Sequence, residues 1–365
     1  MPERVLVRKI VDLTRAVNEA FDFLQFDFAN KKVWVKPNLL APHPPESGVT
    51  TDPELIRQVV RELRRRGAAR IWVGDNPAGV HTQPMEKYLA PTGVVTASEG
   101  CFVNVSINPV TLRLNSRFIS EIPVSALIND VDVILNLPVF KTHGLTIITG
   151  AIKNLFGIIP GGHKTYLHTL AKNAIEFAEL LVDIYQAVPK PVLTIMDGIR
   201  GMDGPNGPSG GRVLKLNLLL TSANPVALDA VMTLLAGGKP EKIPTNRIAR
   251  ERGLGPIAPD QIEMVGDFQP IKGFVLPPVR LAAAVSKVST LIYPLLRRLP
   301  ILDRKRCIQC GKCAENCPKK AINLSTYPRI NIKRCISCFC CSEICPTHAI
   351  TIAPTLKSLL IRSTH

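Results

Sequence analysis

Aromatic and acidic residues are both scarce in this chain of 365 residues. Phe, Trp and Tyr make up 5% of the sequence, and 29 Asp and Glu stand against 45 Lys and Arg, which gives a net charge of +16. A pI near 9.6 raises the question of nucleic-acid binding. No nucleic-acid recognition motif accompanies the charge, however, and few rings are available for base stacking. We therefore expect the positive charge to serve something other than a nucleic acid.

Long apolar runs are absent as well. The stretch 274–302 comes closest to the length of a membrane span, but four basic residues interrupt it. Apolar residues near helical spacing within 273–300 leave two interpretations, contact with a membrane surface or packing between two domains, and we favour packing. Residues 1–10 alternate charged and apolar side chains without the apolar core of a signal peptide, so we expect a cytoplasmic location.

Eight of the ten cysteines form two quartets near the C-terminus, each spaced C-x-x-C-x-x-C-x-x-x-C-P and offset by 28 residues. This is the ligand spacing of two-cluster bacterial ferredoxins, in which the fourth cysteine ligates the other cluster. The spacing predicts two [4Fe-4S] clusters. One uses Cys307, Cys310, Cys313 and Cys345, and the other uses Cys335, Cys338, Cys341 and Cys317.

The two quartets also match outside the cysteines, since Ala321 and Ile322 correspond to Ala349 and Ile350 at the same offset. An internal duplication explains this match. A disulfide framework and a pair of zinc sites are the alternative interpretations of the spacing, and we favour the clusters. The two remaining cysteines, Cys101 and Cys340, are expected to be small buried apolar side chains with inert thiols.

Composition divides the chain into four segments. We expect an α/β domain over 1–270, a basic apolar linker over 271–302, a two-cluster ferredoxin domain over 303–353 and a basic tail over 354–365. Residues 303–365 carry 11 Lys and Arg against 3 Asp and Glu, which is half of the net charge. This local excess favours an acidic redox partner such as a ferredoxin or a flavodoxin.

Strand and helix signals alternate over the first domain, which predicts an α/β layered fold with a mostly parallel sheet. Asp52 is expected to cap a helix that Gly67 ends, and another long helix is expected over 166–188. Residues 80–125 show no clear pattern. The expected strands are 32–40, 70–75, 131–137, 191–197 and 214–221.

Polar residues follow these strands, at the edge where ligands of open α/β sheets bind. We expect an anionic substrate or cofactor to bind there, with help from a helix beginning at Gly161. The glycine-rich segment 198–211 is expected to be a mobile lid. The anion-binding candidates are Lys36, Asn38, Asp75, Lys153, Asn154, Lys164 and Asp197, and the catalytic candidates are Lys141, His143 and His168.

The segment 33–236 resembles domain-of-unknown-function family 362. The resemblance is carried by Thr51-Asp-Pro-Glu-Leu-Ile56, Val139-Phe-Lys-Thr-His-Gly144, Ala151-Ile-Lys-Asn-Leu-Phe-Gly157 and the turn at Asp197-Gly198. Members of that family often carry a ferredoxin module. The resemblance implies an iron–sulfur protein of anaerobic bacterial or archaeal metabolism, and it assigns no catalytic residues.

Three functions follow from these observations. The leading hypothesis is an oxidoreductase in which the clusters exchange electrons with an anion bound at the strand ends, where His143 or His168 supplies protons. The alternative is a non-enzymatic electron carrier or complex subunit whose α/β domain is a docking platform. A redox sensor is the third. A histidine metal site formed by His143, His163 and His168 is a further alternative for the same region.

Overall fold

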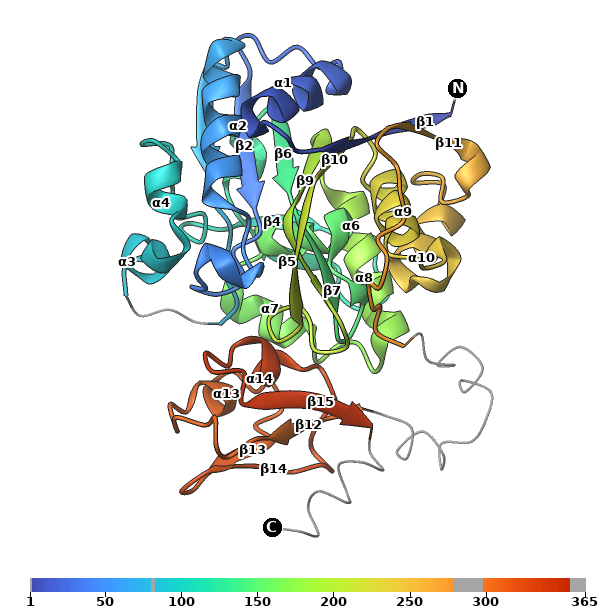
Figure 1. Ribbon diagram of the computed structural model, residues 1–365. Coiled ribbons are helices and arrows are strands. Elements are labelled where there is room, and N and C mark those ends of the chain that lie inside the picture. The colour runs from blue at the N-terminus through green and yellow to red at the C-terminus, as the bar shows by residue number, and fades with distance from the viewer. Residues whose placement is uncertain (1, 80–82, 279–297, 355–365) are drawn as a thin grey trace.

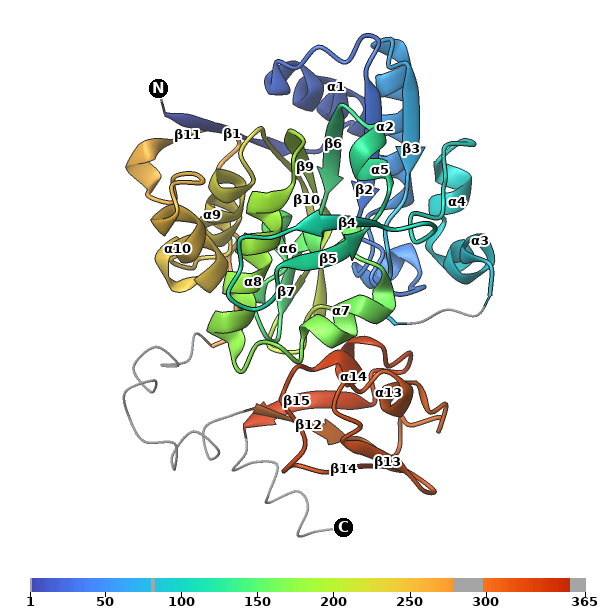
Figure 2. The same cartoon turned by 180° about the vertical axis from the view of Figure 1, so that it is seen from behind.

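The computed structural model describes residues 2–79, 83–278 and 298–354. A large α/β domain is followed by a small domain that lies against one end of it (Figures 1 and 2). Among the described residues no helix combines the length and apolar character needed to cross a membrane. Most of the predicted linker and tail, 279–297 and 355–365, lies outside the described residues.

One sheet forms the centre of the large domain, with its main path in the order β11-β1-β10-β9-β6-β2-β3. Strands β3, β2, β6 and β9 are parallel, and β10 runs antiparallel to β9 and to β1. The predicted mostly parallel sheet is therefore confirmed. The strands are β1 (Glu3–Lys9), β2 (Lys32–Pro37), β3 (Arg70–Val73), β6 (Val133–Leu137), β9 (Val192–Asp203), β10 (Arg212–Ser222) and β11 (Ile262–Gly266).

Strand β7 (Val139–His143) continues the chain directly after β6. It pairs in parallel with the second half of β9 and in antiparallel with the short β8 (Ile147–Ile148). The fold thereby extends the sheet toward the small domain (Figure 1). This extension carries the side chains of β7 to the interface between the domains.

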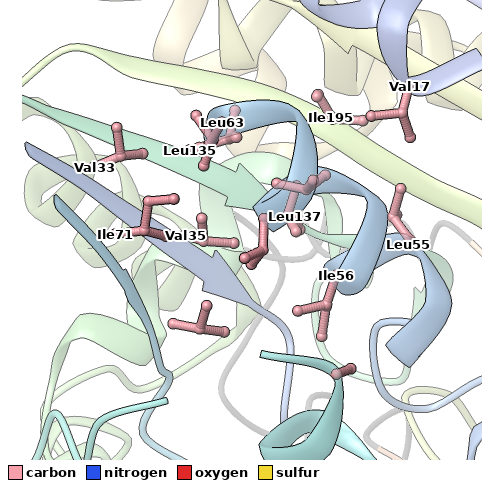
Figure 3. Close-up of a cluster of buried hydrophobic side chains, with 14 of the residues drawn as sticks. Val17, Val33, Val35, Leu55, Ile56, Leu63, Ile71, Leu135, Leu137 and Ile195 are labelled. Atoms are coloured by element: carbon pink, nitrogen blue, oxygen red, sulfur yellow. The ribbon is translucent and has the colours of Figure 1, made fainter. Parts of the chain in front are cut away.

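Helices cover both faces of the sheet because buried side chains alternate along the strands. Val33 and Val35 face α1 (Leu13–Leu24) and α2 (Pro53–Arg65), whereas Trp34 faces the other side, where α8 (Ala174–Ala187) packs. Figure 3 shows the first of these cores. The result is a three-layer α/β/α domain. The other helices of this domain are α3 (Met85–Leu89), α4 (Val94–Ala97), α5 (Leu127–Asp130), α6 (Gly150–Asn154), α7 (Gly161–Leu167), α9 (Pro225–Leu235) and α10 (Pro244–Glu251).

The structure corrects one prediction about local structure and assigns a segment for which the sequence showed no pattern. The single helix expected over 166–188 is two helices, α7 and α8, because Asn173 begins a new helix by accepting hydrogen bonds from Ile175 N and Glu176 N at 2.9 Å. The previously unassigned residues 80–125 contain α3, α4 and a hairpin of β4 (Val110–Arg113) and β5 (Glu121–Val124). Asp52 does cap α2, as predicted.

The glycine-rich segment is not a lid over the strand ends. Its first part belongs to β9, where a Cβ on Gly198 would lie 2.7 Å from Leu218 O, so glycine allows the two strands to approach closely. Its second part forms the β9–β10 turn and contacts the small domain, where Asn206 Oδ1 accepts a hydrogen bond from Ile352 N at 3.0 Å. This turn therefore connects the two domains.

The small domain is built from two similar halves. One half contains α13 (Lys312–Glu315) and β13 (Ile322–Leu324), and the other contains β14 (Pro328–Ile330), α14 (Cys340–Glu343) and β15 (Ile350–Pro354). Strand β12 (Arg298–Leu302) pairs with β15. The domain therefore includes residues that precede the predicted boundary at Asp303.

The duplication is visible in the backbone. Left-handed residues recur at the 28-residue offset, with φ of 75° at Gly311 and 66° at Phe339, and 57° at Gln309 and 58° at Ser337. Because most residues avoid positive φ, a shared pattern of this kind indicates that both halves form the same loop. The cysteine spacing and the loop geometry therefore agree.

Candidate functional site

The α/β contribution to the site begins with a buried ion pair at the ends of β2 and β3. Lys36 Nζ lies 2.7 Å from Asp75 Oδ1, and both side chains are almost fully buried. Burial lowers the pKa of Lys36, and the adjacent carboxylate offsets part of that effect. Asp75 Oδ2 also accepts a hydrogen bond from Leu39 N at 2.9 Å. The pair thereby fixes the loop that follows β2.

Three asparagines connect this edge to α6. Asn38 Nδ2 donates to Asn154 Oδ1 at 3.0 Å, Asn154 Nδ2 donates to Asn136 Oδ1 at 2.8 Å, and Asn136 Nδ2 donates to Ala151 O at 3.1 Å. All three side chains are buried. The chain of hydrogen bonds holds α6 against the sheet and positions Lys153 next to it.

The helix starts nearby face groups of the protein itself. Asp229 accepts hydrogen bonds from Ala151 N and Ile152 N at 2.5 and 3.1 Å and so caps α6. At the start of α7, a Cβ on Gly161 would lie 2.1 Å from Gly79 O, because a backbone carbonyl already faces that position. The start of α7 therefore packs against a backbone carbonyl, and the expected contribution of this helix start to anion binding stays a prediction.

A cavity of about 70 Å³ lies where the α/β domain meets the small domain. Residues of the loops after β2 and β3, of α6 and of α7 form one wall, and Asn316, which follows α13, and residues of α14 form the other. The polar and ionisable side chains that line the cavity include Asn38, Asp75, Asn76, Lys153, Asn154, Lys164, His168, Asn316, Cys340 and Glu343.

The cavity brings together six of the ten predicted pocket residues and leaves out four. Lys36 lies behind Asp75, in the ion pair described above. Lys141 and His143 on β7 and Asp197 on β9 do not line the cavity. The residues brought together are Asn38, Asp75, Lys153, Asn154, Lys164 and His168.

Two lysines provide positive charge inside this cavity. Burial lowers the pKa of Lys153, whose Nζ makes no hydrogen bond or close ion pair with any residue that the structure describes. Lys164 donates a hydrogen bond to Asn76 O, and burial lowers its pKa to about 8. Lys164 therefore remains largely protonated at neutral pH, and the amine of Lys153 is available to a ligand.

The histidines differ from the sequence expectation. His168 is stacked on Phe177 with ring centroids 4.2 Å apart, and burial lowers its pKa to about 3. Burial also lowers the pKa of His143 to about 4. Neither imidazole titrates near neutral pH, whereas Lys164, with a pKa of about 8, lines the cavity and titrates closer to that range.

His143 connects the two domains. Its Nδ1 accepts a hydrogen bond from Leu145 N at 3.0 Å, so the imidazole proton is on Nε2, which lies 3.1 Å from Glu343 Oε1. Burial alone would raise the pKa of Glu343, but His143 and Lys153 outweigh it and lower the pKa to about 2. Glu343 is therefore an ionised carboxylate buried at the interface.

The two other residues outside the cavity are structural. Lys141 Nζ donates to Val49 O at 2.5 Å, and burial lowers its pKa to about 7. Asp197 accepts hydrogen bonds from Asp52 N at 2.6 Å and Ile199 N at 2.9 Å, and burial raises its pKa to about 7. Asp197 thus fixes the start of α2 relative to β9.

The cysteines of the small domain converge as a cluster site requires. Cys317, Cys335, Cys338 and Cys341, the four predicted ligands of one cluster, line a single cavity. In the other set, the Cys313 thiol feels the charges of Cys345 and Cys310, which places these three close together. The donor chemistry and the exchanged fourth cysteine therefore fit two [4Fe-4S] clusters.

Backbone amides support the cysteine sulfurs in both halves. Ala321 N donates to Cys317 Sγ and Ala349 N donates to Cys345 Sγ, each at 3.2 Å. Such N–H···S bonds stabilise thiolate and tune cluster potentials. None of the ten cysteines forms a disulfide. Among the described residues no group of three or more His, Cys, Asp or Glu is arranged to hold a single metal ion.

Sequence reasoning missed Cys340 and Glu343, which line the interdomain cavity and flank Cys341. The Cys340 thiol hydrogen-bonds to the Cys338 sulfur, and this bond and burial raise the pKa of Cys340. Cys340 is thus a partly exposed cavity residue and not the buried residue that we expected, while its raised pKa agrees with an unreactive thiol. Cys101 is also partly exposed, and its sulfur accepts a hydrogen bond from Arg64 at 3.5 Å.

Comparisons with solved structures give distant similarity. The lactate racemase apoprotein of Thermoanaerobacterium thermosaccharolyticum is 15% identical, with a TM-score of 0.40 over 63% of this chain and 57% of that one. A structural-genomics protein of Thermotoga maritima is 15% identical, with a TM-score of 0.36 over 62% of this chain. The chain spans 57% and 58% of the lengths of these two structures.

Sequence comparisons are more specific. The chain is 32% identical to Thylakoid-associated protein sll1697 of Synechocystis over 228 residues, which cover 62% of this chain and 70% of that protein. The 4Fe-4S dicluster domain matches residues 299–346. The family described as Domain of unknown function (DUF362) matches residues 33–233, and the chain therefore belongs to the DUF362 family.

Proposed function

We propose that this protein is an iron–sulfur oxidoreductase that exchanges electrons with a small anion bound in the interdomain cavity. The 4Fe-4S dicluster domain supports an iron–sulfur electron-transfer role. The observation that carries the proposal is the composition of the cavity wall. Lys153 and Lys164 line one side of it, and Cys340 and Glu343, which flank the predicted ligand Cys341, line the other.

The charge of the cavity favours an anionic ligand. The Lys36–Asp75 pair is neutral overall, Glu343 contributes one negative charge and Lys164 one positive charge, and Lys153 adds a second amine, whose pKa burial lowers. Because Lys153 Nζ lacks a hydrogen-bond partner among the described residues, it is the group that an oxyanion would satisfy. Asn38 and Asn76 offer further polar contacts at the same wall.

The size of the cavity limits the ligand. About 70 Å³ is roughly half of the ~150 Å³ apolar cavity that accommodates benzene. A ligand of roughly three or four non-hydrogen atoms, such as a short carboxylate or an inorganic oxyanion, would fill it. At ~1.5 kcal/mol per atom, such a ligand binds with a Kd no tighter than tens of micromolar.

The residues around the ligand have separate roles in this proposal. Lys153 binds the anion, and Lys164, with a pKa of about 8, holds the proton that a reduced ligand would accept. Neutral His168 and the asparagines orient the ligand. The clusters, held by the eight cysteines, supply single electrons at this side of the cavity.

Anion binding to the anaerobically prepared holoprotein tests the proposal. Formate, acetate, nitrite and sulfite are titrated calorimetrically, and at least one is expected to bind with a Kd below ~1 mM. In Lys153→Met, loss of a charge-assisted hydrogen bond of ~1.5–3 kcal/mol weakens that binding roughly 10- to 150-fold.

The matched control is Lys239→Met, since Lys239 is exposed on the α/β domain and does not line the cavity. This variant is expected to bind the anion as the wild type does. If no small anion binds the wild type, or if the two variants behave alike, the enzymatic proposal fails and the carrier alternative replaces it.

A further inference from the structure

The two halves of the duplicated domain have different surroundings, although their loops share one conformation. Ile308 is 62% exposed and Cys310 is exposed, whereas their counterparts Ile336 and Cys338 are only partly exposed. One half therefore presents its cysteine loop to solvent.

The same asymmetry holds in the short helices that follow these loops. On α13, Lys312 and Glu315 are exposed. Their counterparts on α14 are Cys340 and Glu343, which line the interdomain cavity. The α/β domain thus covers the second half at the place where the first half remains open. His143 Nε2 of the α/β domain lies 3.1 Å from Glu343 Oε1 in this arrangement.

The charge around the open loop is strongly positive. Residues 303–320 contain six exposed basic side chains and two acidic ones, Asp303 and Glu315. Asp303 is already within 3.6 Å of Arg306, which it partly neutralises. The exposed basic residues are Arg304, Lys305, Arg306, Lys312, Lys319 and Lys320.

We propose that this surface, Arg304–Lys312 with Lys319 and Lys320, is the docking site for an acidic one-electron carrier protein. An exposed apolar residue within a ring of charge is the composition of a transient interface, in which apolar contact at the centre holds the complex and charge at the rim steers the encounter. Ile308 is the exposed apolar residue of this loop, two positions before the exposed Cys310. One electron is exchanged in each encounter, without proton transfer and without forming or breaking a covalent bond.

This inference depends on the proposed electron-transfer role and adds a partner to it. The exposed half would exchange electrons with the carrier protein, and the covered half would exchange electrons with the ligand in the cavity. The two copies of the duplicated loop would therefore have different functions. The carrier surface and the anion cavity share no lysine. The two sites can therefore be tested separately.

The experiment measures binding of a flavodoxin, as an acidic carrier, to the intact holoprotein at low and high salt. In the double variant Lys305→Glu and Lys312→Glu, the association rate constant is expected to fall about tenfold or more at low salt, because steering is lost. The difference should disappear near 1 M salt, where the Debye length is about 3 Å.

The duplication supplies a matched control, Lys333→Glu with Arg334→Glu. Lys333 and Arg334 are exposed basic residues at the positions equivalent to Lys305 and Arg306, and the control makes the same change in net charge. It is expected to slow association less than about threefold. Iron content and far-UV circular dichroism confirm that each variant is intact.

Two results would overturn the docking site: equal slowing in both double variants, or flavodoxin binding to neither variant nor wild type at low salt. Anion affinity, measured in the same proteins, separates this result from the proposed function. A variant that loses flavodoxin and keeps its anion supports the docking site. If Lys153→Met loses anion binding and keeps normal flavodoxin binding, the result supports the cavity and does not test the docking site.

Discussion

The buried pair of Lys36 and Asp75 gives the sharpest stability prediction. The Nζ and Oδ1 atoms are 2.7 Å apart, and the side chains are 0% and 3% exposed. Lys36→Met leaves the Asp75 carboxylate buried without its counter-ion, which costs ~3–5 kcal/mol in comparable pairs. We expect the free energy of unfolding to fall by that amount, which is a large share of the stability of a typical domain.

A second variant distinguishes loss of the charge balance from loss of packing. In Lys36→Met with Asp75→Asn, the remaining side chain is neutral and its amide oxygen can still accept the hydrogen bond from Leu39 N, which is 2.9 Å long. The double variant should therefore recover at least ~2 kcal/mol relative to Lys36→Met.

Urea unfolding followed by tryptophan fluorescence is a suitable assay. The two tryptophans of the chain, Trp34 on β2 and Trp72 on β3, are both in the α/β domain, and Trp34 is fully buried. The signal thus reports on the domain that contains the ion pair. A loss below ~1 kcal/mol in Lys36→Met, or no recovery in the double variant, would refute the reasoning.

Three further predictions concern the cavity and the clusters. If Lys164 must be protonated to support the anion, affinity is present below its pKa of about 8 and declines as the pH rises through that value; calorimetry from pH 6 to 9 should show this decline in the wild type and not in Lys164→Met. Because the fourth cysteine is exchanged between halves, Cys317→Ser with Cys335→Ser should remove one cluster and leave about four irons per chain, as counted by iron and sulfide assays. Gly161→Ala should weaken anion binding several-fold with little change in iron content, since its Cβ would lie 2.1 Å from Gly79 O and must displace the cavity wall.

Each of these predictions has an outcome that contradicts it. A parallel decline with pH in Lys164→Met would assign the titration to another group. Loss of all iron in the double cysteine variant would mean that each quartet binds its own cluster. An unchanged anion affinity in Gly161→Ala would show that the start of α7 does not shape the cavity.

The sequence was sufficient for those features that local pattern determines. Cysteine spacing predicts the cluster loops because ligands must follow one another around a tight turn, and Gly311 and Phe339 show that the two turns match. The uninterrupted apolar run Val33-Trp34-Val35 predicts a strand that is buried on both faces. The role of Asp52 as the N-cap of α2 could also be predicted, because a helix cap depends on the local sequence.

Features that depend on contacts between the two domains could not be predicted from the sequence. Glu315 and Glu343 occupy equivalent positions, and nothing local indicates that the second is buried against the α/β domain while the first is exposed. Lys141 and His143 follow a strand as ligand-binding residues often do, but β7 continues the sheet past the cavity. In the sequence the glycines of β9 resemble those of a flexible loop. In the structure they allow the neighbouring strands to approach β9 closely, which the sequence does not reveal.

The wall shared between the two domains has a consequence for how the protein must be made. Asn38 and Lys153 come from one domain and Cys340 and Glu343 from the other, so neither domain alone contains the complete cavity. A single chain keeps the two parts at a high effective concentration and in equal number, whatever the level of expression. Separating the genes for the two halves would make the cavity depend on protein concentration, which the fused chain avoids.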